Sequence, residues 1–181
     1  MKLLGLVKFW YVLVCALIVF LSWSLFNYED LSPSKRLEQA SLTPNSPICL
    51  QIYYTIEKYS KEYRIPKYIA YNIAFLETRY QGPFDWTYDP FLTSSAGAVG
   101  PMQVMVKTAE YINKKGTTKL ELRTNLDLNI STSMKLLRKL HNTYGDWAIV
   151  CGYYNTGYPR VNSYAEFCAT NKKYTKNWIS F

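Results

Sequence analysis

Residues 68–80, YIAYNIAFLETRY, carry a helical pattern that places one acidic residue on an apolar stripe. Ile69, Ile73 and Glu77 stand four residues apart, and residues at this spacing lie one above another on the same face of a helix. The face that buries the two isoleucines must therefore bring Glu77 to the core or to the floor of a cleft.

This position predicts an unusual acidity for Glu77. A desolvated carboxylate holds its proton more tightly, and the negative end of the helix dipole also disfavours an anion in the last turn. Both effects raise the pKa, and a carboxylic acid that stays partly protonated near neutral pH suits general acid catalysis. The alternative interpretation is an ion pair with Arg79, or a side chain whose carboxyl group lies in solvent.

The rest of the chain from residue 48 onward is also dominated by helical spacing. Helices are expected over residues 49–63, 66–80, 102–113 and 147–155, with a last one from about 160, and another helical face is marked by Leu126, Ile130, Met134, Leu137 and Tyr144. Gly145 and Gly157 are expected to end helices and Asp146 to cap one. Residues 81–101 contain too much Gly, Pro and Ser for regular structure, and a loop of this length is usually functional. The fold class is therefore mainly α.

The N-terminus predicts a membrane anchor. Residues 9–26 contain no charge, are long enough to cross most of a bilayer core, and follow Lys2 and Lys8, which favour a cytoplasmic segment 1–8. A cleaved signal peptide is the alternative, but no Ala-x-Ala-like site follows. Residues 27–47 are rich in Pro and Ser and predict a linker. The remaining chain is then a domain over 48–165, on the far side of the membrane, and a basic tail over 166–181.

Charge limits the choice of partners. From residue 48 onward the chain has 17 Lys and Arg against 10 Asp and Glu, so the domain itself is basic. Such a surface can bind nucleic acid, anionic lipid or anionic wall polymers. No nucleic-acid motif is recognised, so nucleic acid is not expected as a partner. The basic tail is expected either to touch anionic membrane or wall polymer, or to be a frayed end.

Cysteine and histidine usage gives two further expectations. Cys49, Cys151 and Cys168 would lie in an oxidising compartment, and an odd number leaves one thiol unpaired. A Cys49–Cys168 bridge that clamps the two ends of the domain is expected, with Cys151 simply buried in its apolar run. A single histidine, His141, cannot build a metal site, and neither a metal nor a cofactor is expected.

Four motifs in a fixed order give the chain a family resemblance. They are Glu-Thr-x-Tyr at 77–80, Ser-x-x-Gly-Ala-x-Gly-x-Met-Gln-Val-Met-x-x-Thr-Ala at 94–109, Asn-Ile at 129–130, and Tyr-Asn-x-Gly-x-x-Arg-Val at 154–161. Together they resemble the soluble lytic transglycosylase (SLT) domain, a peptidoglycan-cleaving family with a lysozyme-like fold. The resemblance covers about residues 48–161.

The resemblance implies roles for particular residues. Glu77 matches the single catalytic acid/base of the family, and Tyr154 and Asn155 match the pair that approaches this acid and the substrate. The expected substrate-binding set is Thr78, Gly97, Ala98, Gly100, Met102, Gln103, Tyr154 and Asn155.

The implied reaction cleaves the β-1,4 bond between N-acetylmuramic acid and N-acetylglucosamine without water and leaves 1,6-anhydro ends. The alternatives are a hydrolase like goose-type lysozyme, in which Asp85 or Asp89 would activate water, and a catalytically silent wall-binding scaffold. The glycan strand, the membrane, and a secretion machine or virion are the expected partners. The expected location is a bacterial inner membrane, or a membrane inside a virion, with the domain on the cell-wall side.

Overall fold

The computed structural model describes residues 45–173 and, nearer the N-terminus, residue 17. The expected segments 1–8 and 9–26 and most of the linker therefore lie outside the described residues, as does the end of the tail from 174. Within the described part, no helix is both long enough and apolar enough to cross a membrane.

The described domain is built from helices and loops, which confirms the mainly α fold class. In the described part of the chain the helices are α3 (Ile48–Glu62), α4 (Lys67–Thr78), α5 (Val106–Asn113), α6 (Lys119–Thr124), α7 (Leu126–Tyr144), α8 (Trp147–Thr156) and α9 (Ser163–Thr170). Among the described residues, strand-like pairing occurs only at isolated bridges, where Val99 faces Thr93 and Val104.

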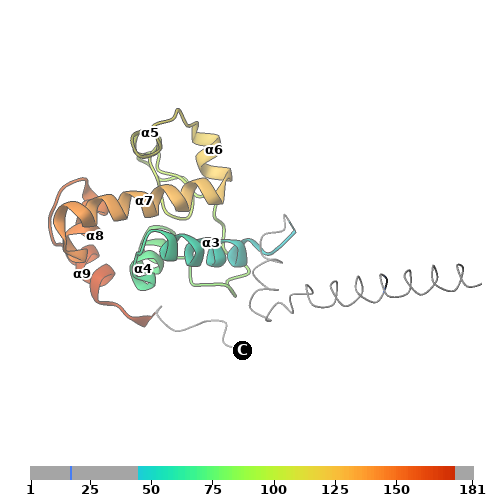
Figure 1. Ribbon diagram of the computed structural model, residues 1–181, viewed down its shortest axis with the longest axis horizontal. Coiled ribbons are helices and arrows are strands. Elements are labelled where there is room, and N and C mark those ends of the chain that lie inside the picture. The colour runs from blue at the N-terminus through green and yellow to red at the C-terminus, as the bar shows by residue number, and fades with distance from the viewer. Residues whose placement is uncertain (1–16, 18–44, 174–181) are drawn as a thin grey trace, which may run out of the picture. The chain divides into compact units, whose positions relative to one another are not determined.

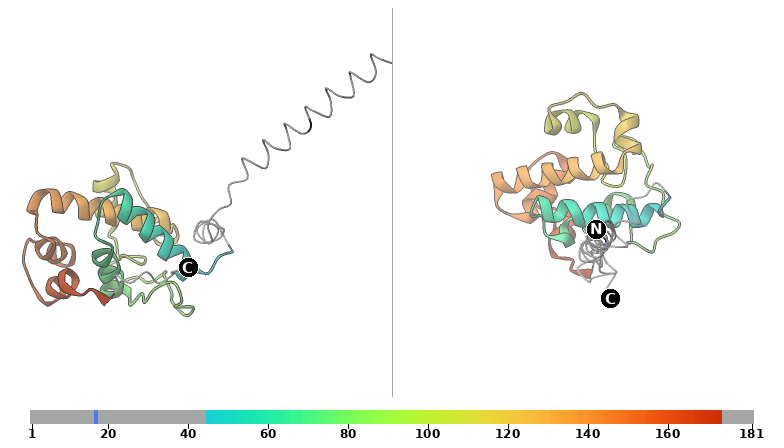
Figure 2. Two further views of the ribbon diagram at one scale, coloured as in Figure 1. Left: turned by 60° about the horizontal axis from the view of Figure 1, so that its bottom comes forward. Right: turned by 45° about the vertical axis from the view of Figure 1, so that its right-hand side comes forward.

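Helix α7 is the central element of this domain (Figure 1). It packs against α3, α5, α6 and α8, and it lies between the α3–α4 pair and the α5–α6 pair both in Figure 1 and in the right view of Figure 2. Its apolar face, with Ile130, Met134 and Leu137 fully buried, forms the middle of the core. Each such side chain contributes about 1.5–3 kcal/mol through burial, so this stripe fixes where α7 lies.

The helix ends follow the expected capping residues. Gly145 and Gly157 adopt left-handed φ values of 70° and 76° after α7 and α8. The Asp146 carboxylate accepts hydrogen bonds from the backbone N–H groups of Ala148 and Ile149 at the start of α8. Gly145 and Asp146 thus form the short turn between α7 and α8.

Two helix starts were predicted wrongly. The helix expected from 102 begins at Val106, because residues 99–104 form a tight turn in which Val99 and Val104 exchange backbone hydrogen bonds and Gln103 has a φ of 47°. The last helix begins at Ser163 instead of about 160, since Asn162 supplies the cap.

Helix α6 was not expected. Thr118 and Glu121 form a capping box at its start, in which each side chain bonds the other residue's backbone N–H. The Thr-x-x-Glu pattern is a sequence signature of a helix start, and here it was overlooked.

Candidate active site

Glu77 lies in the last turn of α4, at the edge of the buried stripe. Ile73 and Ile69 are fully buried one and two turns before it, respectively, and Glu77 itself is half-buried. The helix thus brings a carboxyl group to the boundary between core and solvent, as its spacing predicts.

The Glu77 carboxyl group is held by a tyrosine from a distant segment. The Tyr164 hydroxyl, on α9, donates a hydrogen bond to Glu77 Oε1 at 2.7 Å. Burial raises the pKa of Glu77 above its ordinary value, and the bond from Tyr164 opposes this shift by stabilising the carboxylate. The raised pKa agrees with the direction expected from the sequence.

Tyr154, on α8, lies near the same carboxyl group. Its hydroxyl donates to the Met102 carbonyl oxygen at 2.6 Å and lies 3.0 Å from Ser133 Oγ on α7. Burial raises the pKa of Tyr154, and the negative charge of Glu77 raises it further. The structure therefore brings Glu77, Tyr154 and the backbone of Met102 together, from α4, α8 and the loop before α5.

The loop that carries the expected glycines is fastened by Asn129. This side chain is fully buried on α7, accepts from the Met102 backbone N–H, and donates to the carbonyl oxygens of Val99 and Leu122. A Cβ atom on Gly100, which has a φ of 78°, would lie 2.4 Å from the Asn129 side chain. Glycine is therefore required at position 100 by both conformation and contact.

The remaining loop residues of the expected set differ in accessibility. Gly97 has a φ of 87°, and a Cβ there would meet no neighbour within 4 Å. Ala98 and Met102 have buried side chains. The Gln103 amide donates to the carbonyl oxygens of Gly100 and Leu92, so its nitrogen serves the loop itself.

Thr78 and Asn155 lie in different surroundings. Thr78 is buried, and its hydroxyl bonds Ala74 O, Pro101 O and the Tyr88 hydroxyl. This network ties α4 to the long loop. Asn155 is exposed, and its Oδ1 accepts a bond from Asn162 at 3.2 Å.

The two aspartates of the long loop serve its turns. Asp89 Oδ1 accepts the Phe91 backbone N–H at 2.8 Å, and Asp85 Oδ1 accepts the Thr87 hydroxyl at 3.3 Å. Burial is the main cause that raises the pKa of Tyr88, and the negative charges of the two aspartates raise it further, whereas the pKa of Glu77 is shifted by burial and by the hydrogen bond from Tyr164.

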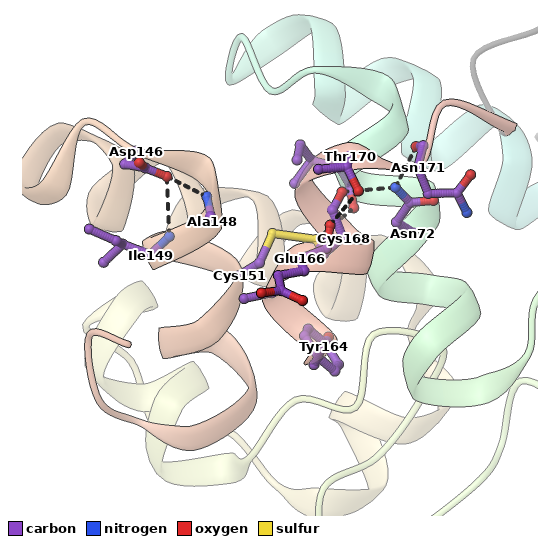
Figure 3. The surroundings of a disulfide bond; sticks show 12 residues. Asn72, Asp146, Ala148, Ile149, Cys151, Tyr164, Glu166, Cys168, Thr170 and Asn171 are labelled. Carbon is purple, nitrogen blue, oxygen red and sulfur yellow. Dashed lines mark hydrogen bonds between the residues drawn. A yellow bond between two sulfur atoms is a disulfide. The ribbon is translucent and has the colours of Figure 1, made fainter. Parts of the chain in front are cut away.

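The expected Cys49–Cys168 bridge is wrong: the disulfide joins Cys151 and Cys168 (Figure 3). Helices α8 and α9 pack closely and bring these two Cα atoms to 6.2 Å, within the range that a disulfide spans. Cys49 remains a free thiol, buried against the long loop, where its Sγ donates to Pro83 O. One bridge and one unpaired thiol among these three cysteines agree with the count.

Helix α9 is held in place at several points around this disulfide. The buried Asn72 amide on α4 donates to the carbonyl oxygens of Cys168 and Asn171, each at 2.8 Å (Figure 3). Gly152 lets α8 pack closely against the segment that leads into α9, since a Cβ there would lie 1.7 Å from the Arg160 carbonyl oxygen. Helix α9 also crosses the boundary expected at residue 165, and its residues up to Thr170 belong to the folded domain.

Sequence reasoning missed Tyr164 and Gly152, and it placed Asn129 in the Asn-Ile motif at 129–130 without expecting a role for its side chain. That role could have been found as the role of Glu77 was, because Asn129 is a polar residue beside the apolar face of a helix. Tyr164 stands four residues before Cys168, on the same side of α9, but only the position of α9 shows that this side meets α4.

The comparisons with known proteins agree with this architecture. The transglycosylase SLT domain model matches residues 54–178, more than half of the chain, and the chain therefore belongs to the SLT transglycosylase family. The membrane-bound lytic murein transglycosylases D of Escherichia coli K12 and of Escherichia coli O6:H1 are each 26% identical over 92 residues. That match covers 50% of this chain and 20% of each relative. No solved structure matches it significantly.

Proposed function

We propose that this protein is a lytic transglycosylase that cleaves the bond between N-acetylmuramic acid and N-acetylglucosamine and leaves 1,6-anhydro ends. The observation that carries the proposal is the Glu77 carboxyl group, which is half-buried, raised in pKa and bonded by Tyr164. Family membership supplies the substrate class.

In the proposed mechanism Glu77 acts twice. Its protonated form donates the proton to the oxygen of the glycosidic bond as that bond breaks, while the acetamido group of the substrate stabilises the developing positive charge. The resulting carboxylate then removes the proton of the C6 hydroxyl group, whose oxygen closes the anhydro ring. Glu77 ends the cycle protonated, and no water is consumed.

The chain's own groups fit these two steps. Burial favours the proton-bearing form for the first step, and the Tyr164 hydroxyl stabilises the carboxylate formed between them. A hydrolase would require a second group to activate water, and Asp85 and Asp89 are both engaged in turns of the long loop. This engagement favours the lyase.

Substitution of Glu77 by Gln tests the assignment. Purified sacculi treated with the full-length protein should release muropeptides with anhydromuramyl ends, detected by mass spectrometry, and E77Q should release none. Reducing ends alone would show hydrolysis and contradict the proposal. If E77Q retained full biological activity, the protein would be a scaffold.

A folding control accompanies this test. Because burial raises the folded-state pKa of Glu77 above its unfolded value, the stability from this group is present at low pH and is lost as pH rises through the folded-state pKa. Glutamine carries no charge at any pH. E77Q should therefore unfold at a temperature equal to or above that of the wild type at pH 8, measured by circular dichroism.

We further propose that the domain acts on the cell-wall side of a membrane, anchored by residues 9–26. The Cys151–Cys168 disulfide supports an oxidising compartment. Such an enzyme would open the wall locally, for the cell's own envelope, for a secretion or conjugation machine, or for a virus. Protease protection in spheroplasts tests the placement: the domain should be digested from outside.

A further inference from the structure

The surface of α7 opposite the candidate active site contains a cavity with an excess of positive charge. This α7 cavity has a volume of about 370 Å³ and is lined by Tyr63, Lys135, Arg138, Lys139, Asn142 and Thr143. Residues advance by about 100° around a helix, so Lys135, Lys139 and Asn142 lie on the side of α7 away from Ser133, which bonds Tyr154. The cavity is therefore separate from the site around Glu77.

The three cations of the cavity are held by neutral oxygen atoms. Lys135 Nζ donates to the Asn113 side-chain oxygen at 3.0 Å, and Lys139 donates to the Tyr111 hydroxyl. Arg138 Nε donates to the Tyr63 carbonyl oxygen at 2.6 Å, and its Nη2 donates to that of Arg64. Lys135 and Arg138 are half-buried, so they are fixed in direction and have lost part of their hydration.

No described carboxylate forms an ion pair with any of these three side chains; the ion pairs of the described residues include Lys58–Asp127 and Lys67–Glu57. Glu62 lies at one edge, where it adds to burial in raising the pKa of Tyr63 to about 12. Partly desolvated cations are usually paired with an anion, and here the described chain supplies none.

The rim of the cavity extends the positive surface. The Tyr111 ring contacts Lys139 at 4.0 Å and Lys114 at 4.6 Å from its centre, and these two cations lower the pKa of its hydroxyl group. Asn142 and Thr143 add neutral donors within the cavity. Ammonium, amide and hydroxyl donors around a guanidinium suit the tetrahedral oxygen atoms of a phosphate group.

We propose that the α7 cavity binds phosphate groups of an anionic polymer in the aqueous phase. An anionic bilayer presents the same chemistry, but a helix that lies on a bilayer also inserts apolar side chains, and apart from Tyr63 the lining is polar or charged. A wall or envelope polymer that carries phosphate fits both the positively charged donors and the polar lining of the cavity. Its binding would retain the protein beside its substrate without occupying the site at Glu77.

Isothermal titration of the full-length protein with sodium tripolyphosphate tests this site. Binding should be saturable, and the double variant K135Q/K139Q should weaken it by roughly tenfold, because each substitution removes one charge-assisted contact. Arg138 is left in place, since it also fastens the turn between α3 and α4. Lys139→Gln alone, whose side chain is exposed, serves as a second variant if the double variant unfolds.

The matched control is K119Q/R123Q. It removes the same charge from another cavity, of about 320 Å³, lined by Thr93, Lys119, Leu120 and Arg123. This control should change the affinity less than twofold. An equal loss in both double variants, or no saturable binding, would overturn the proposal.

Competition distinguishes the sources of phosphate. Vesicles of phosphatidylglycerol with phosphatidylcholine should displace tripolyphosphate no better than phosphatidylcholine vesicles alone. Stronger displacement by the anionic vesicles would assign the cavity to a membrane, and tighter binding of a single-stranded oligonucleotide would assign it to nucleic acid. Either result would overturn the proposal that a wall or envelope polymer occupies the cavity.

Discussion

Two opposite influences act on the pKa of Glu77. Burial at the edge of the α4 stripe favours the protonated acid, and the Tyr164 hydroxyl favours the carboxylate. A group that must both give and take a proton works best when neither form is strongly preferred. Tyr164 therefore has a positioning role with a measurable effect on acidity.

Replacement of Tyr164 by Phe should change the pH profile of the reaction. The loss of its hydrogen bond removes the influence that lowers the pKa of Glu77, so this pKa rises. Activity that requires protonated Glu77 falls as pH rises through this pKa, and the alkaline limb of kcat/KM should therefore move to higher pH. The maximal rate should fall by about tenfold to a hundredfold, as one hydrogen bond to a charged group contributes about 1.5–3 kcal/mol.

Tyr144→Phe is the control for this substitution. Tyr144 is half-buried at the end of α7 and stacks at an angle on Tyr153. Its loss of a hydroxyl should leave the profile in place. An unshifted alkaline limb in Tyr164→Phe, with a lower rate alone, would mean that Tyr164 only supports the packing of α9.

Sequence reasoning finds one partner of this pair and not the other, for a physical reason. Glu77 is revealed by local periodicity, because Ile69 and Ile73 on the same helix determine which way it faces. Tyr164 is 87 residues away, and its contact depends on how α9 packs against α4 and α8. Periodicity predicts which face of a helix is buried, but the residues that this face contacts depend on how the helices pack.

Among the elements, α9 depends most on a covalent link. It has eight residues, too few to form a stable helix alone. The Cys151–Cys168 disulfide joins it to α8 across 17 residues, and Asn72 joins its end to α4. Since α9 carries Tyr164, the link that stabilises the domain also holds the partner of Glu77.

The double variant C151A/C168A should show both effects. A crosslink over this span stabilises by about 3 kcal/mol through the unfolded chain, and urea unfolding should show a loss of that size. Activity measured well below the transition should also fall, because Tyr164 is less firmly held. Reduction of the wild type should reproduce the loss and leave the variant unaffected; a variant with full activity would separate the disulfide from the site.

Helix boundaries marked by a local capping residue were easier to predict than the start of α5 in this chain. Gly145, Gly157 and Asp146 act through local backbone geometry, so their residue types are informative. The start of α5 was misplaced because the bonds that keep residues 99–104 out of the helix come partly from Asn129, on another helix. The cysteine pairing failed similarly, since it depends on the packing of α8 against α9.

At the scale of the whole molecule, α7 lies between the candidate active site and the α7 cavity. On one side Ser133 contacts Tyr154, and Asn129 fastens the loop of Gly100 and Met102. On the other side lie the cations of the α7 cavity. The family resemblance indicated the fold and the loop, whereas the central place of α7 follows from its contacts with four other helices.

Asn129 is the residue through which α7 connects these parts, and its replacement by Ala should affect the whole domain. The change leaves the Met102 N–H and the carbonyl oxygens of Val99 and Leu122 without their buried partner. Unpaired buried polar groups cost about 1–3 kcal/mol each, and partial relaxation should leave a net loss of about 3–5 kcal/mol in the free energy of unfolding, measured with urea. Asn142→Ala, an exposed change on the same helix, should cost less than about 0.5 kcal/mol.

Because Asn129 holds the loop whose Met102 carbonyl bonds Tyr154, activity at low temperature should also fall in Asn129→Ala while the fold persists. Full activity in that folded variant would show that the loop finds its place beside Glu77 without α7.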